Sequence, residues 1–196
     1  MKYYGFYSAD EDLPDDYTDQ YTLFLDSYYR GFIAVFENRT THAIRIKNGN
    51  HIKTLGLSQN ELSAVEKKVY PSQLNDEIHY RLLLRIADHT GAESTIIFRS
   101  ILDLGTHEQY ADKTYRELVK KGLHLKFVNG AVLNSDNFYS DGMIDPATER
   151  LMGRLIRSAL QEADEKQKLP ARLTDLTNAE KKRKPYILSA KEKELW

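Results

Sequence analysis

Ser94-Thr95-Ile96-Ile97-Phe98 is the stretch that decides the fold, because its β-branched and aromatic residues are typical of a buried strand. Before it, apolar residues recur every four positions over 74–87, which predicts a helix. After it, we expect a helix that ends at about Lys121, just before a glycine, and then a strand over 123–128. Strands that alternate with helices in this way predict crossover connections, so the expected fold class is α/β with an open sheet.

Further strands are expected in the N-terminal third of the chain. Residues 2–8 are rich in aromatic side chains and precede an acidic cluster, which predicts a first strand. Four short β-branched and aromatic runs follow, at Thr22–Leu25, Gly31–Phe36, Ala43–Lys47 and Ile52–Leu55. Asn48-Gly49 lies between the last two runs and suits the positive φ angles of a type I′ turn, so it predicts a hairpin. We therefore expect an inserted β element, or an added antiparallel edge, over about residues 22–57.

Local signals also mark where helices begin. The segment 58–61 has the spacing of a capping box, which predicts a helix from there to about residue 70. The segment 106–109 gives a second possible capping box. Asp145 before Pro146 predicts the start of a further helix, because a carboxylate caps free amides and proline needs no amide partner at that position.

The helix after Asp145 is expected to be long and to end before Pro170. Its apolar stripe consists of Leu151, Met152, Leu155, Ile156, Ala159 and Leu160. A stripe of this kind packs against the core of its own chain or forms an oligomer interface, and both interpretations are open at this point. We expect residues 1–169 to form one α/β domain and residues 170–196 to form a basic C-terminal extension.

Composition excludes several kinds of site. The chain has no cysteine, so it has neither disulfides nor thiolate metal ligands. Its six histidines include no pair at metal-ligand spacing, and its glycines form no phosphate-binding loop, so we expect no metal and no cofactor. No apolar stretch is long enough for a signal peptide or a membrane span, which favours a cytoplasmic protein that does not bind membranes.

The net charge of −1 conceals an uneven distribution of charge. Acidic residues dominate the beginning of the chain, whereas its last quarter is basic and contains the run Lys181, Lys182, Arg183 and Lys184. A basic segment can bind nucleic-acid phosphates without sequence specificity, or it can be a solvated tail. The chain has 13 tyrosines, and their concentration beside the N-terminal acidic residues favours a protein interface there.

Three motifs, in order along the chain, resemble the catalytic domain of serine recombinases, the resolvases and invertases. Lys2–Asp10 is similar to the family's opening strand, which carries the nucleophilic serine. The stretch 79–105 is similar to the family's helix, glycine turn and strand that lead into a leucine-glycine motif, here Leu104-Gly105. Ile144-Asp145-Pro146 resembles the entry into the family's long dimerisation helix.

The resemblance implies a resolvase-like open sheet and an origin in DNA recombination, but the residues for that chemistry differ. An ungapped alignment puts Ser8 where the family has an arginine and Asp10 where it has the nucleophilic serine. Leu102, Asp103 and Thr106 stand around the leucine-glycine pair, where the family has aspartate, arginine and arginine. Arginines stabilise the charge on a transferring phosphoryl group, so their replacement implies that catalysis is lost.

The leading hypothesis is therefore a non-catalytic serine-recombinase-like protein of mobile-element origin, a DNA-associated accessory or regulatory oligomer. It would assemble through the long helix, and Lys181–Lys184 would contact DNA phosphates. One alternative is an active site-specific recombinase or DNA nicking enzyme in which Ser8 is a shifted nucleophile. Its cations would then be Arg81, Arg85 or Arg99. Another alternative is a protein–protein adaptor that binds through its tyrosine-rich, acidic N-terminal half.

Overall fold

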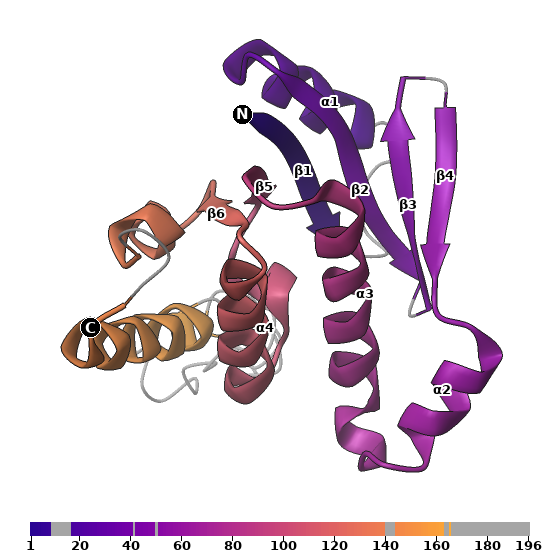
Figure 1. Ribbon diagram of the computed structural model, residues 1–196, viewed down its shortest axis with the longest axis vertical. Helices are drawn as coiled ribbons and strands as arrows, with labels where there is room; N and C mark the ends of the chain where they lie inside the picture. Colours follow the sequence, from indigo (N-terminus) through magenta and orange to yellow (C-terminus); the bar gives the residue numbers. More distant parts are fainter. Residues whose placement is uncertain (9–16, 41, 50, 140–143, 163–164, 166–196) are drawn as a thin grey trace, which may run out of the picture. The chain divides into compact units, whose positions relative to one another are not determined.

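The strand order of the sheet is β4-β3-β2-β1-β5-β6, which places the N-terminal strand in the middle (Figure 1). The computed structural model describes residues 1–8, 17–40, 42–49, 51–139, 144–162 and 165. The strands are β1 (Lys2–Ser8), β2 (Phe32–Thr40), β3 (Ala43–Asn48), β4 (His51–Gly56), β5 (Ser94–Phe98) and β6 (His124–Phe127). β1 is parallel to β2 and β5, β6 is parallel to β5, and β3 and β4 add an antiparallel edge. The expected α/β fold, with an open sheet and an added antiparallel edge, is confirmed.

Helices cover both faces of this sheet. They are α1 (Tyr17–Tyr28), α2 (Gln59–Glu66), α3 (Leu74–Thr90), α4 (Glu108–Lys120) and a C-terminal helix over residues 146–162. Short 3-10 helices are η1 (Pro71–Gln73), η2 (Ile101–Leu104), η3 (Ala131–Leu133) and η4 (Ser135–Asn137). Within the described ranges, no helix is long and apolar enough to cross a membrane.

The chain divides into two units, residues 1–160 and residues 161–196. In the second unit, only residues 161, 162 and 165 are described. The domain boundary expected at residue 169 lies outside the described residues.

The larger hydrophobic core lies between the sheet and the helices α3 and α4. Alternate residues of the strands face it, among them Phe6, Phe98 and Phe127. The rings of Phe98 and Phe127 stack at 5.6 Å, and Phe127 stacks on Tyr115 of α4 at 6.2 Å. All five residues of β5 are buried, as expected from its unbroken β-branched run.

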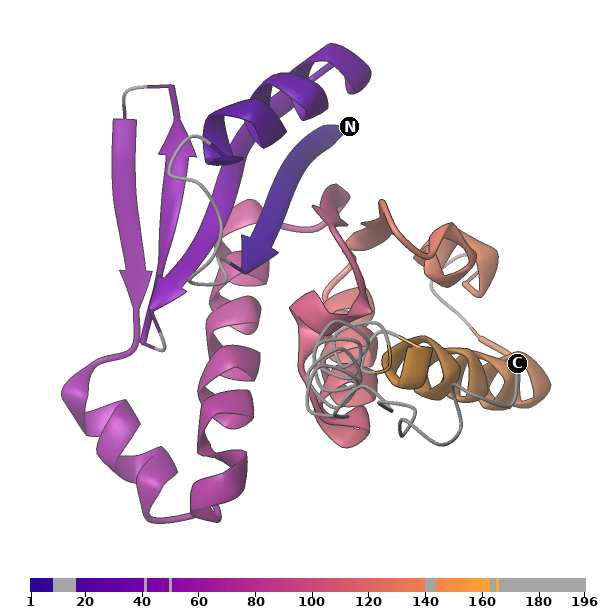
Figure 2. The same ribbon diagram turned by 180° about the vertical axis from the view of Figure 1, so that it is seen from behind.

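A smaller core lies on the opposite face, beneath α1 (Figure 2). Tyr21 and Leu25 are one helical turn apart and both pack on the sheet, where Leu25 is fully buried. The strand predicted over Thr22–Leu25 is therefore wrong, because burial at helical spacing outweighs the β propensity of the run. Gly5 makes the close approach possible: a Cβ there would lie 2.3 Å from the Leu25 side chain.

Most of the predicted turns and caps are confirmed. The hairpin expected at Asn48-Gly49 forms: Asn48 ends β3 opposite His51, and Gly49 has φ +55° in the connection. Asn48 itself has no positive φ, so it is not a central residue of a type I′ turn. The capping box over 58–61 and the cap by Asp145 both form. The capping box predicted over 106–109 is wrong, because no side chain caps α4 and the Thr106 hydroxyl donates to Asp76 instead.

The two edges of the sheet differ in how far other parts of the chain cover them. At the β6 edge, the backbone N–H of Leu125 donates to Ser135 Oγ at 2.9 Å, and that of Phe127 donates to Asn134 Oδ1 at 2.9 Å. Side chains from the following turns therefore occupy amides that a further strand would use. At the other edge, the burial pattern of β4 shows four exposed residues followed by two that are partly buried.

The C-terminal helix packs its apolar stripe against its own chain. Met152, Ile156 and Leu160 belong to the larger core and are 0–7% exposed. Leu155 and Ala159 are partly buried against the same core, whereas Leu151 is 52% exposed. Three of the six residues proposed as an oligomer interface are thus buried within the protomer, and Leu151 is the most exposed of the six.

Candidate functional site

Ser8 is the last residue of β1, at the carboxyl edge of the parallel strands, where ligand sites of α/β folds usually lie. In the sheet register it lies opposite Asn38 of β2. Leu102, Asp103 and Thr106, which the resemblance aligns with catalytic residues, follow β5 at the same edge. The structure therefore brings Ser8 and these three residues together. Asp10 and Lys181, Lys182, Arg183 and Lys184 lie outside the described residues.

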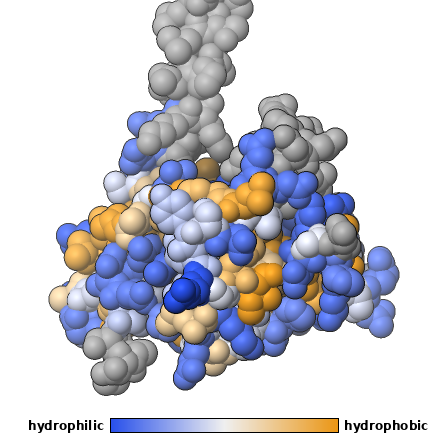
Figure 3. Space-filling model, turned by 90° about the horizontal axis from the view of Figure 1, so that it is seen from above, coloured by the Kyte–Doolittle hydropathy of each residue, from blue (hydrophilic) through white to orange (hydrophobic). Residues whose placement is uncertain are grey.

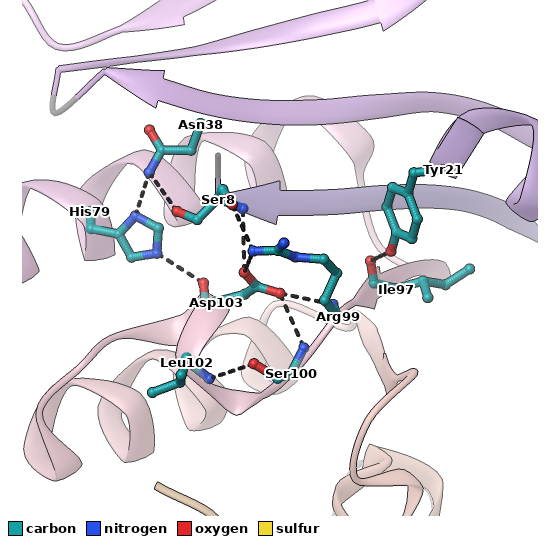
Figure 4. A network of polar contacts seen from close by, with 9 residues as sticks. All are labelled: Ser8, Tyr21, Asn38, His79, Ile97, Arg99, Ser100, Leu102 and Asp103. Carbon is teal, nitrogen blue, oxygen red and sulfur yellow. Dashed lines mark hydrogen bonds and ion pairs between the residues drawn. The ribbon is translucent and has the colours of Figure 1, made fainter. Parts of the chain in front are cut away.

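Asp103 is a buried carboxylate that joins β1 to the segment after β5 (Figure 4). It is 2% exposed and accepts hydrogen bonds from three backbone amides, those of Ser8 at 3.3 Å, Arg99 at 2.8 Å and Ser100 at 3.1 Å. With Ser100 it also forms a capping box around η2. Burial raises the pKa of the Asp103 carboxyl, and Arg99 and the amide donors oppose that shift. The carboxylate is thus saturated by its own chain.

Arg99 contacts Ser8 directly, and it is bound to groups of the protein. Its Nη2 donates to the carbonyl oxygen of Ser8 at 2.6 Å and lies 3.6 Å from Asp103 Oδ1. The guanidinium also lies over the ring of Tyr7, 5.5 Å from its centroid. Its charge is therefore compensated within the fold. The two other expected cations are engaged elsewhere: Arg81 pairs with Glu77, and Arg85 pairs with Glu61.

A chain of hydrogen bonds fixes the protonation of His79, which lies on α3 beside Ser8. His79 Nε2 is 2.9 Å from the backbone oxygen of Asp103, and a carbonyl can only accept, so Nε2 carries the proton. Nδ1 must then accept from Asn38 Nδ2 at 3.1 Å. Asn38 Nδ2 also donates to Ser8 Oγ at 3.3 Å. Burial lowers the pKa of His79, which keeps the ring neutral in this arrangement.

Among the residues that the structure describes, none is placed to act as a general base for Ser8. The hydroxyl accepts a hydrogen bond from Asn38, and both nitrogens of His79 are occupied by other partners. A serine nucleophile needs a neighbouring group that removes its proton. The contacts of Ser8 are instead those of a residue that joins β1, β2 and α3.

A pocket of about 370 Å³ opens beside Ser8. It is lined by Ser8, Asn38, Ser72, Asn75, Asp76, His79, Leu102, Gly105, Thr106 and His107. This lining includes no lysine and no arginine. Asp76 accepts from the backbone N–H and the hydroxyl of Thr106 at 3.1 and 3.2 Å, and it pairs closely with His107 Nδ1. Asp76 is thus the one carboxylate in a lining that has no lysine or arginine.

The described residues at this edge do not include the usual ligands of a metal or of a transferring phosphoryl group. No group of three or more histidine, aspartate or glutamate side chains among the described residues could hold a metal ion. A phosphoryl group in transfer needs converging cations, whereas Asp76 and Asp103 place carboxylates at this edge.

A second surface feature is a groove between α4 and the C-terminal helix, with a volume of about 500 Å³. Four arginines line it: Arg116, Arg150, Arg154 and Arg157. Arg116 pairs with Asp112 at 2.7 Å, and Arg157 pairs with Glu108 at 2.7 Å. Arg150 and Arg154 are exposed, lie one helical turn apart, and have no ion-pair or hydrogen-bond partner in the part of the chain that is described.

The sequence does not single out Asn38 or His79. Asn38 becomes a neighbour of Ser8 only through the pairing of β1 with β2. His79 follows Ile78, a buried residue of α3. A single histidine next to a buried helix position was the one feature of the sequence that could have pointed to it. A comparison with models of known protein families and with curated proteins gives no match to this chain.

Proposed function

We propose that the protein is a non-catalytic relative of serine recombinases that acts as a DNA-associated accessory or regulatory protein. The observation that supports this most directly is the hydrogen-bonded enclosure of Ser8. Its backbone is held by Asp103 and Arg99, and its hydroxyl is held by Asn38.

The residues at this edge of the sheet do not favour cleavage of a DNA strand. Formation of a phosphoserine bond requires a proton acceptor for the hydroxyl and cations for the phosphoryl oxygens. The pocket beside Ser8 contains Asp76 and no cationic lysine or arginine. Removal of a single stabilising donor lowers a rate about 10²- to 10³-fold. The expected arginines are replaced, and Arg99 is paired with Asp103. This edge of the sheet therefore does not favour cleavage of a DNA strand.

Association with DNA is supported by two basic features of the chain. Arg150 and Arg154 present two exposed guanidinium groups from one face of a helix, and such groups suit phosphate oxygens. The basic run Lys181–Lys184 follows later in the chain. Groups of this kind bind DNA without sequence specificity, and the binding weakens as salt increases.

Retention on duplex DNA at low and increasing salt tests the proposal. The variant Arg150→Ala/Arg154→Ala should bind less tightly, and its salt dependence should be shallower by roughly two in log–log slope, one for each phosphate that is no longer neutralised. The matched control is Arg81→Ala/Arg85→Ala, which removes the same charge from α3, where both arginines are ion-paired. Failure of the wild-type protein to bind DNA at low salt would rule out the proposal.

The same DNA substrates test the catalytic alternative. An active recombinase or nicking enzyme that uses Ser8 would form a covalent protein–DNA adduct, and Ser8→Ala would abolish it. We expect no adduct with either protein and equal DNA binding by both. An adduct that depends on Ser8 would replace the accessory role with an enzymatic one.

A protein–protein adaptor is the second candidate, and the outer surface of α1 favours it. Leu23, Phe24 and Tyr28 are 70%, 42% and 74% exposed. Figure 3 looks onto the end of the molecule that carries α1 and shows apolar patches between hydrophilic side chains. An adaptor of this kind would lose its function in the native host through Leu23→Ser/Phe24→Ser and keep it after charge reversal of Lys181–Lys184.

A further inference from the structure

In the described part of the chain, β4 is the last strand on its side of the sheet, whereas Ser135 and Asn134 occupy the β6 edge. Figures 1 and 2 show no helix or strand of the described residues alongside β4 on its outer side. The first four residues of β4 are exposed, and the β-branched side chain of Ile52 is 59% exposed. An open edge of this kind presents backbone donors and acceptors to another strand.

The pairing of β3 with β4 determines which backbone groups point outward. The backbone N–H of Leu57 donates to the carbonyl of His42 at 3.3 Å, so residues 42 and 57 form a hydrogen-bonded pair. Hydrogen-bonded and non-hydrogen-bonded pairs alternate along an antiparallel ladder. The register pairs Ala43 with Gly56 and Asn48 with His51. Residues 51, 53 and 55 therefore bond to β3, whereas Ile52, Thr54 and Gly56 direct their N–H and C=O groups outward.

We propose that two copies of this chain associate through β4, in antiparallel register about a two-fold axis at Thr54. Thr54 is the middle one of the three outward-facing residues, so this register uses all of them. Thr54 pairs with Thr54 of the second copy, and Ile52 pairs with Gly56 of the second copy in both directions. Each of these pairs exchanges both of its hydrogen bonds, and the two sheets become continuous.

The side chains are compatible with this register. Thr54 faces another threonine across the axis, a pairing that stabilises antiparallel strands. Lys53 lies opposite Leu55 of the second copy, so no like charges are directly opposed. A lysine on an edge strand discourages edge pairing in general. If the register were shifted by two residues, Lys53 would lie opposite Lys53 of the second copy, so its charge favours the proposed register over the shifted one.

This interface is independent of the proposed function. Ser8 lies on β1, which β2 and β3 separate from β4, and the arginine groove lies between α4 and the C-terminal helix. Since Met152, Ile156 and Leu160 are buried within the protomer, the β4 edge offers a route to a dimer that does not expose them.

Cysteine cross-linking tests the axis directly, because the natural chain contains no cysteine. In a hydrogen-bonded antiparallel pair the Cα atoms are about 5.5 Å apart, within the range that a disulfide spans. The variant Thr54→Cys should therefore form a covalent dimer under mild oxidation. Ile52→Cys is the matched control, because it is exposed on the same face but lies about 13 Å along the strand from its counterpart across the axis.

Preferential cross-linking through position 54 supports the interface, and equal or greater cross-linking through position 52 overturns it. A second variant, Thr54→Pro, removes the central outward N–H without removing a hydrogen bond to β3. Light scattering should then show a dimer for the wild-type protein and a monomer for Thr54→Pro, with unchanged circular dichroism. A wild-type monomer at the highest soluble concentration, or a folded Thr54→Pro variant that dimerises as strongly as the wild-type protein, would also contradict the proposal.

Discussion

The carboxylate of Asp103 accepts a hydrogen bond from the backbone N–H of Ser8, a residue 95 positions earlier in the chain. One buried side chain thus fixes the end of β1 relative to the turn that follows β5. The position that the resemblance aligns with a catalytic arginine is here occupied by a carboxylate that organises the backbone. A carboxylate in this position joins the ends of two strands, and it supplies no cation to a phosphoryl group.

Asp103→Ala should be strongly destabilising. It would leave three amide N–H groups and the Arg99 guanidinium without their shared acceptor, and removal of one partner from a buried pair costs about 3–5 kcal/mol. Urea unfolding measures this loss. Asp136→Ala is the control, because its partner His124 and Asp136 itself are both exposed, and about 1 kcal/mol or less is expected. Similar losses in the two variants would contradict the role given to Asp103.

Stability should fall as the pH decreases below the ordinary pKa of histidine, about 6.5. The folded state lowers the pKa of His79, so the unfolded chain binds this proton more readily. The stabilising contribution is complete above pH 6.5 and is lost as the pH falls toward the lower folded value, by at most about 1.4 kcal/mol per pH unit. A proton on Nδ1 would also face the amide hydrogens of Asn38.

His79→Gln isolates this effect, because glutamine does not titrate. Chemical unfolding at several pH values between 5 and 8 should give a flatter profile for the variant than for the wild-type protein. Parallel profiles would show that His79 does not carry the pH dependence.

Two glycines should respond in opposite ways to substitution by alanine. At Gly5 the new methyl group would meet Leu25 at 2.3 Å and Tyr21 at 3.2 Å, and overpacking of this kind costs about 1–3 kcal/mol. At Gly153, within the C-terminal helix, nothing lies within 4 Å, and the better helix former should stabilise the protein by about 0.5–1 kcal/mol. Thermal unfolding should therefore give a lower midpoint for Gly5→Ala and a higher midpoint for Gly153→Ala than for the wild-type protein. A neutral Gly5→Ala would mean that α1 does not pack closely on β1.

Ser135→Ala should weaken the β6 edge. The variant would leave the buried N–H of Leu125 without an acceptor, at a cost of about 1–3 kcal/mol. Ser27→Ala is the matched control, because the Ser27 hydroxyl is exposed and donates to the carbonyl of Phe24. Its effect should stay within about 0.5 kcal/mol. Equal unfolding midpoints for the two variants would argue against a stabilising role for Ser135.

Local chemistry made much of this fold predictable from the sequence. Asn48-Gly49 and the capping box over 58–61 act within a few residues, so they could be recognised without knowledge of the rest of the chain. The run Thr22–Leu25 could not, because its helical conformation depends on Tyr21 and Leu25 packing against a sheet formed by later residues. Thr106 was assigned to the wrong cap for a similar reason: its acceptor, Asp76, is 30 residues away.

The site was less predictable than the fold. The sequence directed attention to Ser8, Asp103 and Thr106, and these residues do gather at one edge. The partners that decide their chemistry, Asn38 and His79, are 30 and 71 positions from Ser8, and only the sheet and α3 bring them there. Spacing rules describe neighbours within a helix or a strand, and they contain no information about such contacts.

The central position of β1 has a consequence for how the chain is made. β1 has β2 on one side and β5 on the other, and β5 is completed only at Phe98. Until that point a nascent chain carries an aromatic strand with one unpaired side. Fragments that stop before Phe98 should therefore aggregate or require a chaperone, and the shortest fragment that encloses β1 must reach this residue.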